Sequence, residues 1–568
     1  MNLSYALRSN GLAMKPKTDN PFANATREQT WLRVTQGYTQ RSPEWDVLII
    51  GGGITGAGIL REAARQGLSS ALIEQRDFAW GTSSRSSKMV HGGLRYLLTG
   101  HLKLTRQSIR ERERLLRKAS GLVEPMGFLY PFYRGQWPGR WSFTALITLY
   151  DLLARRSRHR YYAARDLLML VPRIAAQGLT GGIRYEDAVT DDARLVLRNI
   201  REAQQDGAFA LNYVGADRLI INGERVSGVV IRDVLTGQTA EVLARAVVNA
   251  TGAWADRLRA QVEGEKHIRP LRGSHLVFPF WRLPMPQAVT MLHPSDRRPV
   301  ILMPWEGATL LGTTDLDHKE DLDVEASITS PEVEYLLQAV DYQFPSLGIN
   351  RNDILATYSG VRPVIGTGAL NPSSEKRDHS IWSEHGLISV SGGKLTTFRL
   401  IALDVLSRVA RFIPSVTMKD SGDRSLSTPE YQWPGPERID LALKKRLAGR
   451  YGKEAKNVVR CAGDDELTRV PGTDTIWAEL RWAARNEAVV HLDDLLLRRT
   501  PIGVLLHQGG LRFFDRISKI CKEELNWDAD RWDQEAQAYR ILWKRCYSLP
   551  ETMSEPQVPG QIPVKEMD

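Results

Sequence analysis

The stretch Asp46–Gly56, DVLIIGGGITG, joins a short apolar run directly to a glycine-rich turn. An apolar run of this length that ends in glycines is typical of a strand buried in a parallel sheet. Residues 54–66 then have the composition of a helix, and Ser70–Glu74, SALIE, that of a second strand. A strand, a glycine turn, a helix and a strand within about 30 residues form a βαβ unit. The segment therefore predicts an α/β fold built on a Rossmann-like domain.

Three glycines of this turn, Gly51, Gly53 and Gly56, have the spacing G-x-G-x-x-G. The first allows the tight turn, the second lets the backbone approach a pyrophosphate, and the third permits close packing of helix on strand. Glu74 follows eighteen residues after Gly56, at the end of the next predicted strand. A carboxylate there accepts hydrogen bonds from ribose hydroxyls and repels a 2′-phosphate. These residues predict a dinucleotide site but do not distinguish FAD from NAD.

A further predicted strand favours FAD. Residues 247–252 read VVNATG. A strand that ends in Ala-Thr-Gly near the adenosine site resembles two-domain flavoproteins, in which one glycine fingerprint holds one flavin. The sequence has no second G-x-G-x-x-G for a nicotinamide cofactor. The reductant of the flavin must therefore bind directly, as the substrate.

Length and composition limit the number of domains and the class of protein. The chain has 568 residues, which at about 150 residues per domain corresponds to two to four domains. Hydrophobic residues make up 42% and charged residues 25%, a globular composition that excludes wholesale disorder. Three cysteines without a CxxC pair exclude a disulfide framework and a cysteine-based metal site, and fit a reducing compartment. No apolar run reaches about 18 residues and no signal-peptide pattern opens the chain, so we expect neither a transmembrane helix nor secretion.

The formal net charge of +10 lies in two basic segments. Residues 101–118 carry a local charge of +5 and residues 134–165 a local charge of +6. No nucleic-acid-binding motif accompanies them, so we expect no nucleic-acid partner. In the second segment, apolar residues between Phe143 and Ala154 have helical spacing and precede Arg155, Arg156, Arg158 and Arg160. This pattern predicts either a helix lying on an anionic membrane surface or a core helix with a basic end.

A resemblance to a known family becomes specific at Phe78–Leu97, FAWGTSSRSSKMVHGGLRYL. Together with Gly51–Gly56, this segment resembles the FAD-dependent, quinone-reducing glycerol-3-phosphate dehydrogenases of aerobic bacteria and mitochondria. The resemblance covers about residues 45–550. The sequence departs from the family in its longer N-terminal segment and in lacking the EF-hand loops of the mitochondrial members. Further matching motifs follow in order: Tyr185 with DDARL (191–195), RGSH (272–275), GTTD (312–315), YSGVRP (358–363), GGKLTT (392–397) and DDLLLRRT (493–500).

The resemblance implies an enzyme that oxidises sn-glycerol 3-phosphate to dihydroxyacetone phosphate, with FAD as its cofactor. The hydroxyl proton leaves while the hydrogen on C2 moves as hydride to flavin N5, and the electrons then pass to a membrane quinone. The resemblance also implies a cytoplasmic protein, bound peripherally to the inner face of the cytoplasmic membrane. A homodimer is compatible with the sequence. Two alternatives stay open, namely an oxidase that uses oxygen and a flavin-binding sensor without turnover.

The implied architecture is a Rossmann-like FAD-binding domain interleaved with an antiparallel-sheet substrate domain and followed by a helical cap. We expect an N-terminal tail at 1–44, the FAD-dependent oxidoreductase region at 45–425, the cap at 437–550 and a C-terminal tail at 551–568. Within the oxidoreductase region, the FAD lobe is expected at about 45–120, 180–265 and 355–415, and the substrate lobe at about 121–179 and 266–354.

A phosphate-bearing substrate needs fixed cations, and arginine suits it because its planar fork binds phosphate through two hydrogen bonds and stays charged. His275 is the leading candidate for the proton acceptor, since imidazole titrates in the right range. A strand histidine also often satisfies only a core hydrogen bond, and His91 lies in an equally similar motif. The resemblance points to Arg95, Tyr96, His275, Arg362, Arg377 and Lys394 as substrate-binding residues, of which His275, Arg95, Arg362 and Lys394 are expected to be catalytic.

Flavin contacts are expected from the glycine turn and from the family motifs. The serines of TSSRSSK supply hydroxyl and backbone donors along the flavin. Asp191 and Asp192 indicate a helix N-terminus rather than a metal pair, and we expect no metal site. The full set expected to bind the cofactor is Gly51, Gly53, Thr55, Gly56, Glu74, Thr82, Ser83, Ser84, Ser86, Ser87, Lys88, His91, Gly92, Gly93, Thr251, Gly252, Gly392, Gly393, Lys394, Leu395 and Thr396.

Overall fold

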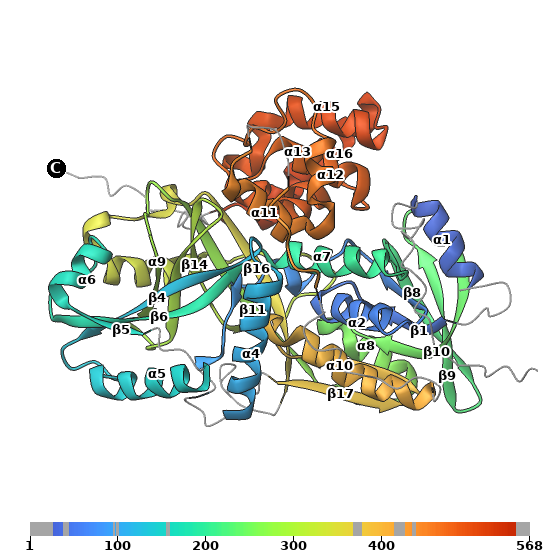
Figure 1. The fold of residues 1–568 in the computed structure, drawn as a ribbon, viewed down its shortest axis with the longest axis horizontal. Coiled ribbons are helices and arrows are strands. Elements are labelled where there is room, and N and C mark those ends of the chain that lie inside the picture. The colour runs from blue at the N-terminus through green and yellow to red at the C-terminus, as the bar shows by residue number, and fades with distance from the viewer. Residues whose placement is uncertain are drawn as a thin grey trace, which may run out of the picture.

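A computed structural model arranges the chain as two sheet-based lobes side by side, with a helical cap above their junction (Figure 1). This arrangement confirms the predicted fold class. The residues it describes are 26–37, 45–94, 97, 102–154, 159–366, 378–413, 426–433 and 439–551.

The first lobe is built on a mostly parallel sheet with the order β17-β18-β10-β1-β2-β7. Only β17 runs antiparallel to its neighbour, and β8 and β9 extend β10 as an antiparallel meander. Three helices, α2, α7 and α10, pack on this sheet and share one apolar core with it. The elements are β1 (Trp45–Ile50), α2 (Ile54–Arg65), β2 (Ser70–Glu74), α7 (Asp192–Gln205), β7 (Phe209–Asn212), β8 (Val214–Asn222), β9 (Arg225–Asp233), β10 (Thr239–Asn249), α8 (Ala255–Arg259), β17 (His379–Glu384), β18 (Leu387–Gly392) and α10 (Phe398–Val409).

The second lobe holds a larger sheet with the order β15-β11-β14-β13-β12-β4-β6-β3, where β16 also pairs with β11 and β5 with β6. Its pairs are antiparallel except for β4 with β12. The elements are β3 (Met89–Val90), α4 (Leu102–Lys118), β4 (Val123–Tyr133), α5 (Arg140–Ala154), β5 (Arg160–Ala163), α6 (Ala164–Leu170), β6 (Leu179–Thr190), β11 (Ile268–Pro279), β12 (Ala288–Leu292), β13 (Pro299–Trp305), β14 (Ala308–Gly312), β15 (Leu316–Asp317), α9 (Ser330–Gln343) and β16 (Ala356–Ile365).

Strand pairing changes the expected lobe assignment of three strands. β3, β6 and β16 fall in ranges that were expected in the FAD lobe, about 45–120, 180–265 and 355–415, but all three pair within the larger sheet. Their residues suit either sheet, so only the partner strand decides their place. The chain therefore passes between the lobes several times.

The helical cap comprises six helices and the π-helical turn Asp494–Arg499. Its apolar side chains form a core that is continuous with buried residues of β4, β6, β11 and β16, so the cap is packed firmly on the second lobe. The helices are α11 (Leu441–Tyr451), α12 (Ala455–Arg460), α13 (Trp477–Asn486), α14 (Ile502–Leu505), α15 (Phe514–Leu525) and α16 (Ala529–Cys546).

The N-terminal segment contains a helix, α1 (Arg27–Gln36), that the sequence analysis missed. Thr26 and Gln29 form a capping box at its start. Arg27 pairs with Asp233 at 2.5 Å, and the buried Val34 accepts a hydrogen bond through its carbonyl from the indole of Trp45. The prediction of a loosely held tail is therefore wrong for residues 26–37, because contacts with the first lobe hold this short polar helix in place.

Helix α5 confirms the predicted helical segment but not the face expected to meet a membrane. Phe143, Ile147 and Tyr150 from the expected apolar face are buried in the protein core. Trp141 and Leu152 lie on the opposite side and are 77% and 72% exposed. The alternative prediction of a core helix is thus confirmed for the face that carries Phe143, Ile147 and Tyr150. Within the described parts of the chain, no helix has both the length and the apolar character needed to cross a bilayer.

Candidate functional site

A deep cavity opens at the carboxyl ends of three strands of the first sheet. Gly51 follows β1, Thr251 follows β10, and Gly393 follows β18, and all three line the cavity. Open α/β sheets bind their ligands at this edge, because loops that leave the strand ends there meet around one space. The glycine turn, the Ala-Thr-Gly turn and the Gly-Gly turn singled out in the sequence are therefore brought together.

The glycine turn is shaped by its backbone. Gly51 has φ +114°, and a Cβ on it would lie 2.6 Å from the carbonyl oxygen of Ala250. A Cβ on Gly56 would lie only 1.9 Å from the carbonyl oxygen of Gly51. Gly53 caps α2 with no side-chain hydrogen bond, so the start of this helix faces the cavity through backbone alone. That arrangement suits a pyrophosphate.

Glu74 lines the cavity but also holds the turn. Its carboxylate accepts hydrogen bonds from the amides of Gly52 at 2.7 Å and Arg76 at 2.8 Å. Burial raises the pKa of Glu74, and these two amides oppose that effect. Because a carboxylate has about four acceptor positions, the two amides leave capacity for the hydroxyls of a ribose.

The segment around TSSRSSK divides into cavity-lining and structural residues. Ser83 accepts a hydrogen bond from the amide of Ile54 at 2.9 Å, which joins the segment to the start of α2. Ser86 donates through its amide and hydroxyl to Asp192, at 2.9 and 2.7 Å, and Lys88 pairs with the same carboxylate at 2.6 Å. Asp192 thus anchors this segment, a role that the sequence analysis did not assign to it. The flanking Asp191 is the N-cap of α7, as predicted.

Most of the residues expected to bind the cofactor line this cavity. Gly56 instead packs behind the turn, and Ser84 and Lys88 line a small enclosed space between the second lobe and the cap. Ser87, His91, Gly92, Gly93 and Thr396 do not line the cavity. Those that do are Gly51, Gly53, Thr55, Glu74, Thr82, Ser83, Ser86, Thr251, Gly252, Gly392, Gly393, Lys394 and Leu395.

Two tryptophans of the cavity wall were not predicted from the sequence. Trp80 and Trp254 both line it, with ring centroids 5.9 Å apart. Trp80 lies inside the quoted family segment and Trp254 follows the Ala-Thr-Gly turn, so their places in the motifs were the available signal. Other lining residues that were missed are Gln75, Val214, Ala216, Arg257, Leu258, Gln261 and Pro363.

His275 lies on β11, with its ring stacked on Tyr358 of β16 at a centroid distance of 4.6 Å. Its Nε2 is 2.8 Å from the hydroxyl of Ser87. Burial, followed by the charges of Arg362 and Lys88, lowers the pKa of His275 well below its ordinary value of 6.5. The imidazole is therefore neutral at physiological pH, which is the form that accepts a proton.

Arg362, also on β16, is fixed by polar partners on the second sheet. Its guanidinium donates to Asp315 at 3.0 Å and to the hydroxyl of Thr313 at 2.9 Å. A Cβ on Gly273 of the neighbouring strand would lie 2.1 Å from this guanidinium, so a side chain there would displace Arg362. Asp315 is almost fully buried. The motif GTTD was recognised in the sequence, but the contact of its aspartate with Arg362 was not predicted.

Two residues connect the expected substrate site with the cavity wall. Pro363, next to Arg362 in β16, lines the cavity, and so does Lys394, which precedes the turn Leu395–Thr397. The charge of Arg362 is, after burial, a cause of the lowered pKa of His275. Strand β16 thus joins Tyr358, which stacks on His275, and Arg362 to Pro363 in the cavity wall. Arg95, Tyr96 and Arg377 lie outside the described residues.

The cavity fits a flavin dinucleotide by the chemistry of its walls. Gly53 and Thr55 offer a helix start to the pyrophosphate, and Glu74 offers acceptors to the ribose. The Trp80–Trp254 pair and Val390 supply apolar surface for the rings. Gly393 and Lys394 complete the wall at the Gly-Gly turn.

Comparison with known proteins gives matches over the whole fold. The family FAD dependent oxidoreductase matches residues 46–399, and the C-terminal domain of alpha-glycerophosphate oxidase matches residues 415–532. The aerobic glycerol-3-phosphate dehydrogenase of Bacillus subtilis is 38% identical over 528 residues, covering 87% of this chain and 92% of that protein. Glycerol-3-phosphate dehydrogenase 2 of Mycobacterium tuberculosis is 33% identical over 550 residues, covering 92% and 93%. The X-ray structure of the glycerol-3-phosphate dehydrogenase from Bacillus halodurans complexed with FAD has a TM-score of 0.74 at 28% identity, covering 92% of this chain and 98% of that one.

Proposed function

Because this chain belongs to the family of FAD-dependent glycerol-3-phosphate dehydrogenases, we propose that it oxidises sn-glycerol 3-phosphate to dihydroxyacetone phosphate and passes the electrons to a membrane quinone. FAD is its cofactor. When bound, FAD accepts the hydride from C2 at its N5 atom and supplies the electrons to the second acceptor. The observation that supports this function best is the cavity at the carboxyl ends of β1, β10 and β18, whose wall holds the glycine turn, Glu74 and Lys394.

The protein's own residues bind and orient the substrate. Arg362, held in place by Asp315, and Lys394 supply positive charge for the phosphate. His275 accepts the proton of the C2 hydroxyl at an imidazole nitrogen, because burial and nearby cations keep it neutral. By the family resemblance, Arg95, Tyr96 and Arg377 complete the phosphate site.

Anaerobic bleaching of the flavin tests the substrate. Glycerol 3-phosphate should bleach the yellow holoenzyme, whereas free glycerol, which lacks the phosphate, should bleach it far more slowly. Bleaching by glycerol at an equal rate, or no bleaching by glycerol 3-phosphate, would contradict the proposal. Reoxidation then tests the acceptor: a soluble quinone should restore the colour faster than dissolved oxygen, and the reverse order would identify an oxidase. No turnover with either acceptor or with artificial dyes would identify a sensor.

We propose that the protein meets the membrane through the exposed side of α5 and the residues just before it. Trp137, Trp141, Leu149 and Leu152 are exposed there, and the guanidinium of Arg140 lies 3.7 Å from the ring of Tyr161 next to them. Exposed tryptophans beside arginines suit the headgroup region of an anionic bilayer. A quinone confined to the bilayer gives a mechanistic reason for this contact.

Vesicle sedimentation tests this surface. The wild-type protein should pellet with anionic phosphatidylglycerol vesicles and be released by high salt. A Trp141→Ser/Leu152→Ser variant should pellet several-fold less and still reduce a soluble dye. Ile541→Ser, which removes a 57% exposed side chain from the cap, is the matched control and should pellet like the wild type. Equal binding by the double variant would place the membrane contact elsewhere.

A further inference from the structure

The cap holds the loop that forms one wall of the cofactor cavity, although it lines none of that cavity itself. The loop Gln75–Thr82, here called the flavin loop, contributes Gln75, Trp80, Gly81 and Thr82 to the wall. Among the described residues, every lining residue precedes position 396, and the cap begins after position 437. The cap must therefore act on the cofactor through residues that contact both the cap and the cavity wall.

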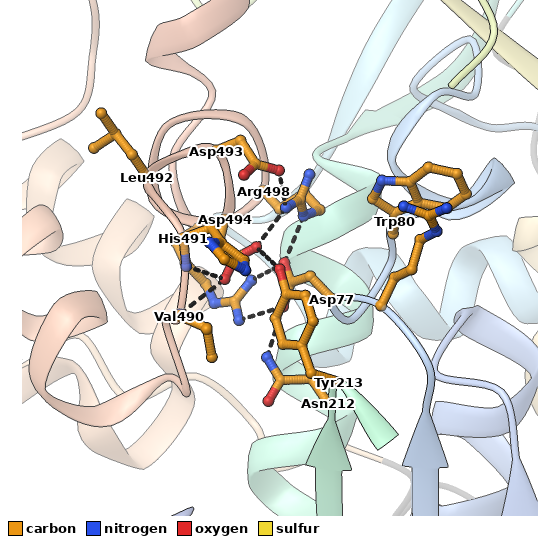
Figure 2. Close-up of polar contacts among 12 residues, drawn as sticks. Asp77, Trp80, Asn212, Tyr213, Val490, His491, Leu492, Asp493, Asp494 and Arg498 are labelled. Carbon is orange, nitrogen blue, oxygen red and sulfur yellow. Dashed lines mark hydrogen bonds and ion pairs between the residues drawn. The ribbon is translucent and has the colours of Figure 1, made fainter. Parts of the chain in front are cut away.

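Asp77 is the point of attachment. Its side chain is fully buried, and it accepts two hydrogen bonds from Arg499, at 2.6 and 2.7 Å, and one from Arg498 at 2.5 Å. Asn212, at the end of β7, donates a further bond at 3.0 Å. Burial alone would raise the pKa of Asp77, but the two arginines outweigh it and lower the pKa, so the carboxylate is charged. Figure 2 shows this carboxylate enclosed by the cap on one side and β7 on the other.

The arginines are themselves fixed by the cap. Arg498 also pairs with Asp494 at 2.6 Å and Asp493 at 2.7 Å. Asp494 accepts hydrogen bonds from the hydroxyl of Tyr213 at 2.6 Å and from the amide of His491 at 2.9 Å (Figure 2). The cap, the flavin loop and the end of β7 thus meet in one buried network, which we call the cap junction. Its members are Asp77, Asn212, Tyr213, Asp494, Arg498 and Arg499.

A second contact holds the far side of the loop. Arg85 follows the flavin loop, pairs with Glu325 at 2.6 Å, and lies 5.1 Å from the ring of Trp80. It also donates to the hydroxyl of Tyr547 at 3.3 Å, just after the last helix of the cap. The carbonyl of Tyr547 accepts a hydrogen bond from the amide of Thr357 on β16 at 2.8 Å. The cap therefore reaches Trp80 from both directions.

We propose that the cap acts as a clamp on cofactor binding: Asp77, Arg498 and Arg499 are positioning residues that fix the flavin loop in the conformation that holds FAD. Loss of Asp77 leaves the buried guanidinium of Arg499 without its ion-pair partner, and loss of both arginines leaves the buried carboxylate of Asp77 without one, so the loop relaxes to hydrate these groups. Coupling between two sites is reciprocal, so bound FAD also stabilises the packing of the cap. The inference rests on FAD binding and is independent of the substrate and the electron acceptor.

The first test compares two buried ion pairs of the cap. Asp77→Asn removes the charge on the flavin loop, whereas Glu454→Gln breaks the pair that Glu454, in the cap, forms with Arg201 of α7 at 2.5 Å, away from the loop. Release of FAD from the holoenzyme is followed by the rise in FAD fluorescence. We expect release at least tenfold faster in Asp77→Asn and within twofold of the wild type in Glu454→Gln. Equal acceleration in both variants, or none in Asp77→Asn, would overturn the clamp.

A milder variant guards against misfolding of Asp77→Asn. Arg499→Lys keeps the charge but loses the two-pronged contact with Asp77. It should release FAD about threefold faster than the wild type, and a rate equal to the wild type would count against the clamp.

The second test needs no substitution. Hydrogen exchange of the wild-type protein is compared with and without FAD. Amides of Asp494–Thr500 should exchange at least threefold more slowly when FAD is bound, while those of α12 should change less. Unchanged exchange at Asp494–Thr500 would contradict the coupling. Both tests give the same result whether or not the protein oxidises glycerol 3-phosphate, so failure of the proposed reaction is separately visible.

Discussion

The glycine turn and the cap junction border the same loop but are built in opposite ways. The turn is formed by six residues, Gly51–Gly56, and its tightest contacts are with the backbone carbonyl groups of Gly51 and Ala250. The junction is made by charged side chains, and Asp77 and Arg499 are 422 residues apart in the chain. The turn excludes side chains for lack of space, whereas the junction depends on particular ones. We therefore expect the turn to fail through steric overlap and the junction to fail through unpaired charge.

The largest effect is expected from adding one carbon to the turn. In Gly56→Ala the new Cβ would lie 1.9 Å from the carbonyl oxygen of Gly51, so the turn must open. The purified variant should hold FAD at least about a hundredfold more weakly, as measured by fluorescence of free FAD after gel filtration. Gly139→Ala is the control, because the nearest atom to its Cβ is 3.8 Å away. Stoichiometric FAD in Gly56→Ala would show that the turn tolerates a side chain.

A second buried ion pair, between α7 and the cap, tests how much folding stability is lost when a buried charge at this boundary has no partner. Arg194 of α7 binds Glu487, just after α13, at 2.8 and 2.5 Å, and both side chains are 1% exposed. Glu487→Gln leaves a buried guanidinium unpaired, so we expect a loss of about 3–5 kcal/mol, seen as a lower urea midpoint. Glu241→Gln, from a pair 3.8 Å apart with side chains about two-thirds exposed, should leave the midpoint unchanged. Equal midpoints for wild type and Glu487→Gln would refute the argument from burial.

The substrate end of the cavity should lose activity without losing the cofactor. Arg362→Ala removes a cation held by Asp315, and we expect kcat/KM for glycerol 3-phosphate to fall by a factor that corresponds to about 2–4 kcal/mol. The flavin content should stay at the wild-type level, because Arg362 lines none of the cavity. Arg232→Ala, at an exposed pair with Asp217, is the control. An unchanged kcat/KM in Arg362→Ala would remove Arg362 from the site.

The smallest effect concerns a histidine beside the junction. His491 lies 2.9 Å from Glu535, and this hydrogen bond raises the pKa of His491 against the opposing effect of burial. Because the folded pKa exceeds the unfolded value of 6.5, protonation stabilises the fold below pH 6.5, and this contribution is lost as the pH rises through the folded pKa. In His491→Gln the free energy of unfolding, measured by urea titration, should therefore change less between pH 6 and pH 8 than in the wild type. The difference should be under about 1 kcal/mol, since the side chain is partly exposed. An equal change in wild type and variant would contradict the assignment.

The sequence predicted those helices and strands that depend only on residues close together in the chain. The strands at 46–50 and 70–74 and the helix at 54–66 follow from apolar runs and glycine spacing, and they hold the cavity. Helix α1 was missed because its partners, Asp233 and Trp45, lie elsewhere in the chain. Strands β3, β6 and β16 were assigned to the wrong lobe because the sequence of a strand does not determine which strand it pairs with.

The same limit applies to the site. Gly51 and Glu74 were predicted as cofactor residues from spacing, and both line the cavity. Asp315 lies in the motif GTTD, and Asp77 directly precedes the family segment that begins at Phe78. Neither was predicted to have a role, because each pairs with an arginine that the fold brings from another segment. Residue spacing within one segment therefore predicts side chains that contact a ligand better than it predicts side chains that hold other side chains in place.

The separation of Asp77 from Arg499 has a consequence for biosynthesis. Ribosomes add about 5–20 residues per second, so roughly 20–80 s pass between the synthesis of Asp77 and that of its partner 422 residues later. During this interval the nascent chain holds the glycine turn and the flavin loop but not the arginines that neutralise Asp77. From the proposed clamp we therefore expect secure retention of FAD only in the finished polypeptide, and a chain truncated before residue 499 should lose its FAD.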